Sequence, residues 1–216
     1  MLNQVYDWMD ERLQLKATIS NLLEHPVPAH VNFLQCFGGI TFTLILLQVV
    51  TGMFLALYYV ASPEQAFASV EYISKEVVFG KLVRGMHRVG ASLAIIMVVL
   101  HMLRVYFTGS YKRPREMNWL AGVLLLFVLL GFGFTGYLLP WDQKAYWATA
   151  VGTNMAGSVP IIGDFLLKIL RGGTELGSLT LTRFYAVHIW FLPVMLTGLL
   201  AMHFYMVRKQ GIAGPL

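Results

Sequence analysis

Four histidines occur as two pairs with nearly the same spacing. His87 and His101 are fourteen residues apart, and His188 and His203 are fifteen residues apart. In an α-helix these intervals correspond to a rise of about 21 and 22 Å, and they bring both members of a pair to roughly one face. Haem iron takes such nitrogens as axial ligands, and two axial imidazoles leave no open position on the iron. The pattern therefore predicts two bis-imidazole haem b sites, suited to electron transfer rather than to oxygen binding.

The two pairs can meet only if the helices that carry them run in the same direction. In a bundle of four alternating spans the second and fourth do so. His87 is then expected to face His188 near the outer side, and His101 to face His203 near the inner side. A single histidine in a membrane helix is more often a polar tether between helices, but four at matched spacing favour haem iron.

The composition indicates a membrane protein. Apolar residues make up 57% of the 216 residues and charged residues 12%, whereas soluble domains contain about 25% charged residues. The net charge of +5 does not indicate nucleic acid, because the basic residues stand at the ends of apolar runs, as membrane flanks do. The single cysteine, Cys36, excludes an intrachain disulfide, a cysteine-rich zinc site and an iron–sulfur cluster held by this chain alone.

Four stretches are long and apolar enough to cross a bilayer, which takes about 20 residues. We expect spans at residues 33–59, 82–107, 117–141 and 184–207. The second span is the least clean, because only fifteen residues separate Arg88 from Arg104. Ionisable residues at membrane depth are costly and indicate a function. The predicted fold is an all-α integral membrane four-helix bundle.

The N-terminal segment, residues 1–24, is predicted to be an amphipathic helix on the membrane surface rather than a secretory signal. Its apolar stripe at helical spacing consists of Leu2, Val5, Tyr6, Met9 and Leu13. Residues 25–209 would form the di-haem transmembrane domain and residues 210–216 a C-terminal tail. His25 and His30 lie beside prolines before the first span and are interpreted as interfacial polar residues.

Basic residues in the short connections predict the orientation. Lys112, Arg113 and Arg115 lie between the second and third spans, and Arg208 and Lys209 follow the fourth. Short loops rich in Lys and Arg remain in the cytoplasm. We therefore expect both termini on the cytoplasmic or stromal side.

Glycines repeat the spacing of the histidines. Gly38 and Gly52 are fourteen residues apart, and so are Gly122 and Gly136. Glycine lets a helix backbone approach a flat haem where a side chain would collide. Because glycine is common in membrane helices the pattern is weak alone, but beside the histidines it favours two haem levels.

Basic side chains near the two levels are candidate partners for haem propionates. Arg84 and Arg88 lie one turn on either side of His87, while Lys112 and Arg115 lie at the inner end. Arginine can grip a carboxylate with two donors. It can equally reach lipid phosphate from a helix end. We expect Arg84 to contact a propionate and leave both readings open for the others.

Several stretches of the sequence match those of one known family. They are Gln48-Val-Val-Thr51-Gly52, Arg84-Gly-Met-His87, His101-Met-Leu-Arg104, Gly136-Tyr-Leu-Leu-Pro140-Trp141-Asp142, Leu181-Thr-Arg183-Phe-Tyr-Ala-Val-His188 and Arg208-Lys-Gln-Gly-Ile-Ala-Gly-Pro-Leu216. Through them the chain resembles, almost from end to end, the cytochrome b6 family. These are the split-type cytochrome b subunits of quinol–cytochrome c or plastocyanin reductases, found in thylakoid or bacterial cytoplasmic membranes.

The resemblance implies a third haem. In the family a cysteine at the inner end of the first span holds a c-type haem through one thioether bond, and Cys36 matches that position. No Cys-x-x-Cys-His run is present, so only one bond is possible. From its chemistry alone, a lone cysteine is more often a small apolar filler. Arg208, one turn beyond His203, resembles the family's basic residue near this inner pocket.

The resemblance also implies a proton-motive quinone cycle. Quinol oxidation near the outer face would send one electron to a Rieske iron–sulfur protein and one through the two b haems to quinone at the inner face. A second small subunit would supply three further helices and the catalytic glutamate, so no catalytic residue is assigned here. A c-type cytochrome subunit and a dimeric complex are also implied. The connection at residues 142–181 resembles the wall of the quinol pocket, and its glycines and proline predict short surface helices.

Other interpretations remain open from the residues. The chain could be a di-haem anchor of a different dehydrogenase, or a transporter or structural bundle with tethering histidines. One departure from the family is the scarcity of acidic residues before the first span, where only Glu24 follows Glu11. Proton delivery to the inner quinone site therefore has no assigned residue.

Overall fold

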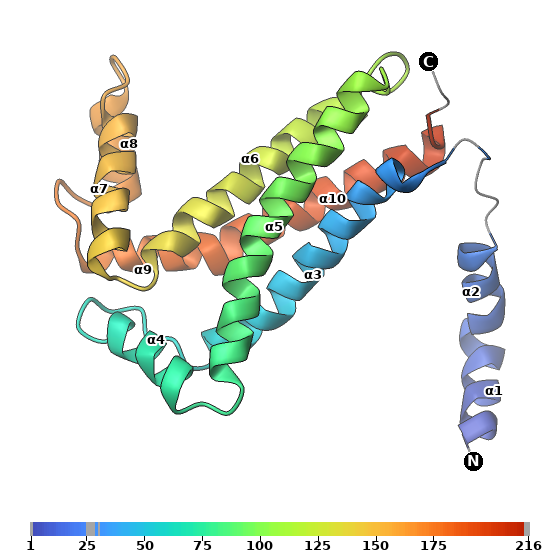
Figure 1. Cartoon of the computed structure of the whole chain (residues 1–216), viewed down its shortest axis with the longest axis horizontal. Coiled ribbons are helices and arrows are strands. Elements are labelled where there is room, and N and C mark those ends of the chain that lie inside the picture. The colour runs from blue at the N-terminus through green and yellow to red at the C-terminus, as the bar shows by residue number, and fades with distance from the viewer. Residues whose placement is uncertain (1, 25–28, 30, 214–216) are drawn as a thin grey trace. The chain divides into compact units, whose positions relative to one another are not determined.

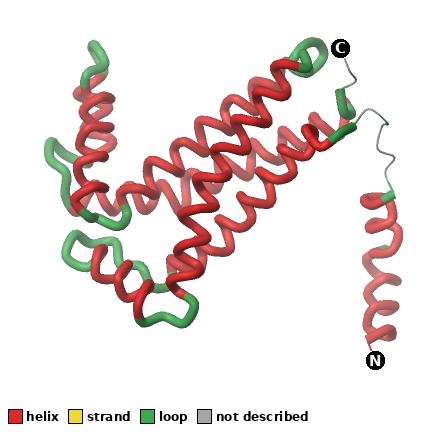
Figure 2. The backbone as a smooth tube through the Cα atoms, in the orientation of Figure 1, coloured by secondary structure: helices red, strands yellow, loops and turns green. Residues whose placement is uncertain are grey.

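The computed structural model describes residues 2–24, 29 and 31–213. Its backbone divides into two units, residues 1–32 and 33–216. The described residues form helices, turns and loops without a β-strand (Figure 2). The predicted all-α fold is confirmed. His25 and His30, and the end of the predicted tail, lie outside the described residues.

The first unit contains two helices, α1 (Leu2–Leu13) and α2 (Leu15–Leu23), where the sequence predicts a single helix. Gln14 separates them with a left-handed backbone, φ 51°. The carboxylate of Asp10 accepts a hydrogen bond from the backbone N–H of Lys16 at 2.6 Å and so satisfies a donor at the start of α2. The ammonium of Lys16 pairs with Asp7 at 3.1 Å, and this pairing raises the pKa of Lys16. Local polar contacts thus stabilise the break.

The second unit carries all the sequence features that predict haem. Its described residues begin with a 3-10 turn, Phe33–Cys36, and this turn is followed by eight α-helices and one π turn. Figure 1 shows their arrangement. The elements are α3 (Phe37–Ala56), α4 (Ala66–Lys75), α5 (Gly80–Phe107), α6 (Glu116–Leu138), α7 (Gln143–Gly157), α8 (Gly163–Arg171), α9 (Ser178–Ala186), the π turn Val187–Phe191, and α10 (Leu192–Gln210).

Four helical stretches of this unit are long and apolar enough to cross a membrane, at the four predicted places. They are Phe33–Ala56, Gly80–Phe107, Glu116–Leu138 and Ser178–Gln210. Four predicted boundaries differ from these helical stretches by three residues or more, and two of them have a local cause. The third span ends at Leu138 rather than at residue 141, because Pro140 lacks the N–H that would continue the helix. The fourth begins at Ser178, where the N–H of Gly177 donates to Oγ1 of Thr180 at 3.2 Å.

The core of the bundle lies midway along the spans. It consists of Ile45, Val98, Leu125, Val128, Leu129, Leu192 and Leu196, which come from α3, α5, α6 and α10. Ile45 is seven residues from both Gly38 and Gly52, and Leu129 is seven residues from both Gly122 and Gly136. An apolar layer therefore separates the two levels at which the histidines lie. Most other large apolar side chains on these helices are exposed, as suits contact with lipid.

The connections from the first to the second span and from the third to the fourth are largely helical and lie at one end of the bundle, whereas the short loop between α5 and α6 lies at the other end (Figure 1). Helix α4, which the sequence analysis did not predict, packs against α5 and contributes Ala66 to a small core with Leu138, Leu181 and Phe184. The hydroxyl of Tyr59 donates to the carbonyl of Leu139 at 2.8 Å, and burial raises the pKa of this phenol. These contacts tie the connection between the first two spans to the end of the third.

The short helices predicted in the connection at residues 142–181 are present as α7 and α8. Asp142 caps α7 by accepting from the N–H of Ala145 at 2.8 Å, and Gly172 ends α8 with φ 81°. Arg171 is 7% exposed and has no carboxylate among its hydrogen-bond partners. Instead it donates to Oγ1 of Thr153 and Oδ1 of Asn154, both at 2.8 Å, and to two backbone carbonyls. Neutral oxygens thus satisfy a buried cation that joins α7 to α8.

Candidate functional site

The structure brings the four histidines together as two pairs at two depths of the bundle. The ring centres of His87 on α5 and His188 on the π turn are 6.4 Å apart. Those of His101 on α5 and His203 on α10 are 6.5 Å apart. Because α5 carries one member of each pair, the two pairs are fourteen residues apart along a single rigid helix. We call them the 87/188 pair and the 101/203 pair.

Two glycines of α3 lie directly against the histidines of α5. A Cβ built on Gly52 would lie 3.2 Å from Cε1 of His87, and one built on Gly38 would lie 3.1 Å from Cε1 of His101. Both distances are tighter than most side-chain contacts. The absence of a side chain at these two positions therefore sets how closely α3 packs on α5 and fixes the space left for each ring.

The same arrangement recurs between α6 and the fourth span. A Cβ on Gly136 would lie 2.8 Å from Cε1 of His188, and one on Gly122 would lie 3.8 Å from Cε1 of His203. Each of the four glycines selected from the sequence thus faces one of the four histidines. In the structure each of these glycines has an imidazole ring as its nearest side chain.

A π turn accounts for the unequal spacing of the two histidine pairs. Helix α5 is α-helical throughout and has fourteen residues between its two histidines, whereas the fourth span has fifteen and contains the π turn Val187–Phe191 around His188. A π turn holds one more residue than an α turn. The extra residue is absorbed there, so both rings of the fourth span meet their partners on α5.

Two threonines contact the histidines, and the sequence analysis did not select them. Oγ1 of Thr51 is 2.9 Å from Nδ1 of His87, and Oγ1 of Thr135 is 3.0 Å from Nδ1 of His188. Each threonine directly precedes one of the glycines that face the 87/188 pair. The repeated Thr-Gly dipeptide was the signal that could have identified them.

The predicted basic residues occupy varied positions. Arg84 is half-buried and donates to Oγ of Ser74 on α4 at 3.3 Å. Arg115 donates to the backbone carbonyl of Gln210 at 3.1 Å and therefore joins the start of α6 to the end of α10. The remaining predicted basic residues, Arg88, Lys112 and Arg208, are exposed.

Arg104 is a further cation that the sequence analysis did not assign to the site. It lies one turn beyond His101 on α5 and is half-buried. Its Nε is buried and has no hydrogen-bond partner within the described part of the chain. An unpaired buried donor beside the 101/203 pair is suited to an anionic group there.

Cys36 is exposed and its thiol is free. It ends the 3-10 turn that precedes α3, two residues before Gly38. Cys36 is therefore not part of the buried core of the bundle. Through Gly38 and its contact with His101, the thiol belongs to the end of the bundle that holds the 101/203 pair.

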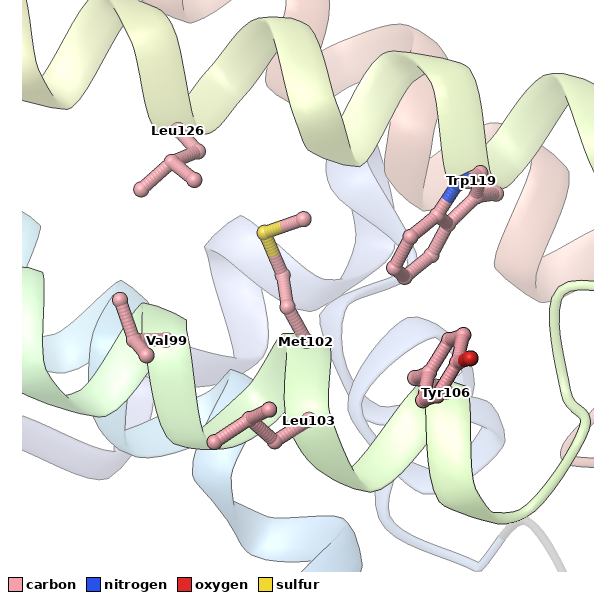
Figure 3. Close-up of a pocket in the computed structure, with 6 residues that line it drawn as sticks. All are labelled: Val99, Met102, Leu103, Tyr106, Trp119 and Leu126. Atoms are coloured by element: carbon pink, nitrogen blue, oxygen red, sulfur yellow. The ribbon is translucent and has the colours of Figure 1, made fainter.

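A shallow hollow of about 220 Å³ lies between α5 and α6, and none of the four histidines is among the residues that line it (Figure 3). Its lining is apolar and consists of Val99, Met102, Leu103, Tyr106, Trp119 and Leu126. The volume is below the range of about 300–1,000 Å³ typical of small-molecule sites. The candidate site is therefore formed by the histidine pairs and not by this hollow.

Comparison with known proteins agrees with this arrangement. The family model Cytochrome b/b6/petB matches residues 22–211. The menaquinol:cytochrome c reductase cytochrome b subunit of Bacillus subtilis (strain 168) is 54% identical, and cytochrome b6 of Chlamydomonas reinhardtii is 48% identical, each over the full length of both chains. A solved chain of a hyperthermophilic respiratory Complex III is 35% identical with a TM-score of 0.90; the match covers 97% of this chain and 56% of that one. The chain is an integral membrane protein, and it belongs to the cytochrome b/b6 family.

Proposed function

We propose that this chain is the di-haem cytochrome b subunit of a quinol:cytochrome c or plastocyanin oxidoreductase. In this role it carries electrons across the membrane in a quinone cycle coupled to proton translocation. Membership of the family implies bound haem b and an interaction with quinol. The observation that carries the proposal is the presence of two facing imidazole pairs, 6.4 and 6.5 Å between ring centres, in one four-helix bundle.

The separation of the rings fits one iron between each pair. Two metal–imidazole bonds of about 2 Å, with about 1.2 Å from each ring nitrogen to its ring centre, give about 6.4 Å between two imidazoles on one metal. The observed 6.4 and 6.5 Å match this value. We therefore assign His87 and His188 as axial ligands of one haem b, and His101 and His203 as axial ligands of the other.

The bundle holds and separates the two sites. When bound, haem supplies one-electron chemistry that no side chain of this chain can provide. The histidines would hold each haem at its depth in the bundle, and the glycines keep the helices close enough for both rings of a pair to face each other. The layer that includes Ile45, Leu129 and Leu196 excludes water between the two levels. Electrons can thus pass between two fixed depths without a mobile carrier.

Within this proposed function, we also assign roles in haem binding to several basic residues and to the cysteine. We assign Arg84, Arg88, Lys112 and Arg115 to haem propionates, and a covalent c-type haem to Cys36. Arg208 would lie beside that third haem. The assignment to Cys36 rests on the family resemblance, and its free, exposed thiol is compatible with a thioether bond. The basic residues of the connection between α5 and α6 support a cytoplasmic or stromal position for both termini.

The partners follow from the same function. The names of the relatives describe subunits of reductases, and we propose that this chain assembles with a small subunit that supplies the remaining helices, a Rieske iron–sulfur protein and a c-type cytochrome, in a dimeric complex. We further propose that α7 and α8 form part of the quinol pocket at their end of the bundle.

A redox titration of the purified complex, followed by reduced-minus-oxidised spectra, tests this function. We expect two b-type components, of which replacement of His87 or His188 by Asn removes one and replacement of His101 or His203 removes the other. W190F is the matched control, because Trp190 lies in the same π turn but is 71% exposed. Immunodetection in membranes separates loss of haem from loss of the protein. Persistence of both components without His87 would contradict the proposal.

A further inference from the structure

The hydroxyl hydrogen of Thr51 is already committed within its own helix. Oγ1 of Thr51 donates to the carbonyl of Leu47 at 2.6 Å. A hydroxyl has one hydrogen to donate and two lone pairs that accept. The contact of 2.9 Å between Oγ1 and Nδ1 of His87 is then satisfied when the imidazole donates and the hydroxyl accepts. His87 is thus held with its hydrogen on Nδ1 and a free lone pair on Nε2.

Thr135 imposes the same state on the other ring of this pair. Its Oγ1 donates to the carbonyl of Gly131 at 2.8 Å and can only accept from Nδ1 of His188, at 3.0 Å. Thr51 and Thr135 are 3% and 8% exposed, so both contacts are shielded from bulk water. Both imidazoles of the 87/188 pair consequently present Nε2 for a metal and donate Nδ1–H to a threonine.

The 101/203 pair lacks this support. The Nδ1 atoms of His101 and His203 are buried. Within the described residues, no side chain accepts a hydrogen bond from either atom. Backbone carbonyls face the rings in both pairs, that of Gln48 at His87, Phe132 at His188 and Asn118 at His203. A threonine hydroxyl is the side-chain contact that both rings of the 87/188 pair share, and the side-chain amide of Gln48 also lies 3.3 Å from Nδ1 of His87.

We propose that Thr51 and Thr135 are positioning residues that lower the reduction potential of the haem held by the 87/188 pair. The proposal rests on the function proposed above. An acceptor on Nδ1–H makes the ligand nitrogen a stronger electron donor. A stronger donor stabilises ferric iron over ferrous iron. On reduction a bound haem would gain one electron, and both imidazoles would keep their Nδ1 hydrogen and remain its ligands.

A purely structural role for the hydroxyls is the competing explanation. Thr41 shows what such a role looks like, because its Oγ1 donates to the carbonyl of Phe37 at 2.8 Å and the side chain is 6% exposed. It lies on the same helix as Thr51, but its hydroxyl contacts no histidine in the described structure. T41V therefore removes an equivalent hydrogen bond within the helix and an equivalent buried hydroxyl, but it does not affect a residue that contacts a histidine.

The test is a potentiometric titration of the assembled complex carrying T51V, T135V, T51S, T135S or T41V. We expect each valine variant to raise the midpoint potential of the component that is lost when His87 is replaced. A tenfold change in the relative binding of the two iron states corresponds to about 59 mV, and we expect a shift of this order. The serine variants should retain the original potential, and T41V and the second b component should be unchanged.

Several outcomes would overturn the proposal. In the first, neither valine variant changes the midpoint potential of an intact haem. In the second, the serine and valine variants change the midpoint potential equally. In the third, the midpoint potentials of both b components change together. If T51V does not assemble, T135V applies the same test from the other side of the iron, and the low-spin EPR signal reports whether both imidazoles remain bound. Failure of the proposed function is distinct, since two b components would then not be observed at all.

Discussion

Gly136 and His188 are in closer contact than a side chain at that glycine would permit. A Cβ on Gly136 would lie 2.8 Å from Cε1 of His188, a separation that real Cβ atoms essentially never show. At Gly122, which occupies the corresponding place on the same helix, the distance to Cε1 of His203 is 3.8 Å, an ordinary van der Waals contact. Two glycines that look equivalent in the sequence are therefore unequal in the structure.

This inequality predicts different results for the same substitution. G136A should displace the ring of His188 and weaken retention of the haem at the 87/188 pair by about 10–100-fold, the range seen when the support of a metal ligand is disturbed. G122A should leave both haems bound, because its methyl group has room. Pyridine haemochrome analysis of the purified complex gives the haem content. Equal losses in the two variants would contradict the glycine–imidazole contacts.

The π turn predicts that one residue can be removed from the fourth span without loss of haem. Deletion of Ile189 shortens the spacing of His188 and His203 to the fourteen residues found in α5, and we expect the π turn to become an α turn with both rings still facing α5. The matched control is deletion of Ala94 from α5. Because α5 has no π turn, the residues that follow the deletion would be rotated by about 100° about the helix axis.

Haem content and the low-spin EPR signal measure both deletions. The Ile189 deletion should keep two bis-imidazole haems, whereas the Ala94 deletion should lose at least one. If the two deletions behave alike, the π turn does not serve to absorb the extra residue.

Arg171 is predicted to hold the α7–α8 connection together. R171M would leave the oxygens of Thr153 and Asn154 without their donor, at a cost of about 1–3 kcal/mol for each buried group left unpaired. K168M, on the same helix, removes only the exposed pair of Lys168 with Asp164 and should change stability by less than about 0.5 kcal/mol.

Limited proteolysis of the connection and the KM for quinol provide the measurements. R171M should increase cleavage between α7 and α9 and raise the KM, while the spectra of both b haems remain unchanged. If the KM for quinol is unaltered although cleavage increases, α7 and α8 are not part of the proposed quinol pocket.

Cys36 is predicted to hold haem that survives denaturation. The wild-type chain should show haem-dependent peroxidase staining on a denaturing gel, and C36S should lose the stain while both b components remain in the spectrum. Retention depends on a covalent thioether, whereas axial ligation by histidine is lost on unfolding. Absence of the stain in the wild-type chain would reject the third haem.

The sequence alone determined the number of spans and the pairing of the histidines. Both depend on local properties, namely the length of an apolar run and the fixed rise and period of an α-helix. For this reason the positions of His87 and His101 on one helix were sufficient to predict two levels. The same reasoning identified Gly52 and Gly136 by their spacing, without saying what they touch.

The tertiary structure decided which atoms meet between helices. The contact of Thr51 with His87 joins residues thirty-six positions apart, and that of Thr135 with His188 joins residues fifty-three apart. No local period specifies such contacts, because they depend on how closely two helices pack and how they are rotated about their axes. The π turn at His188 and helix α4 likewise depend on the tertiary structure. Each is stabilised by packing against other segments rather than by the pattern of its own residues.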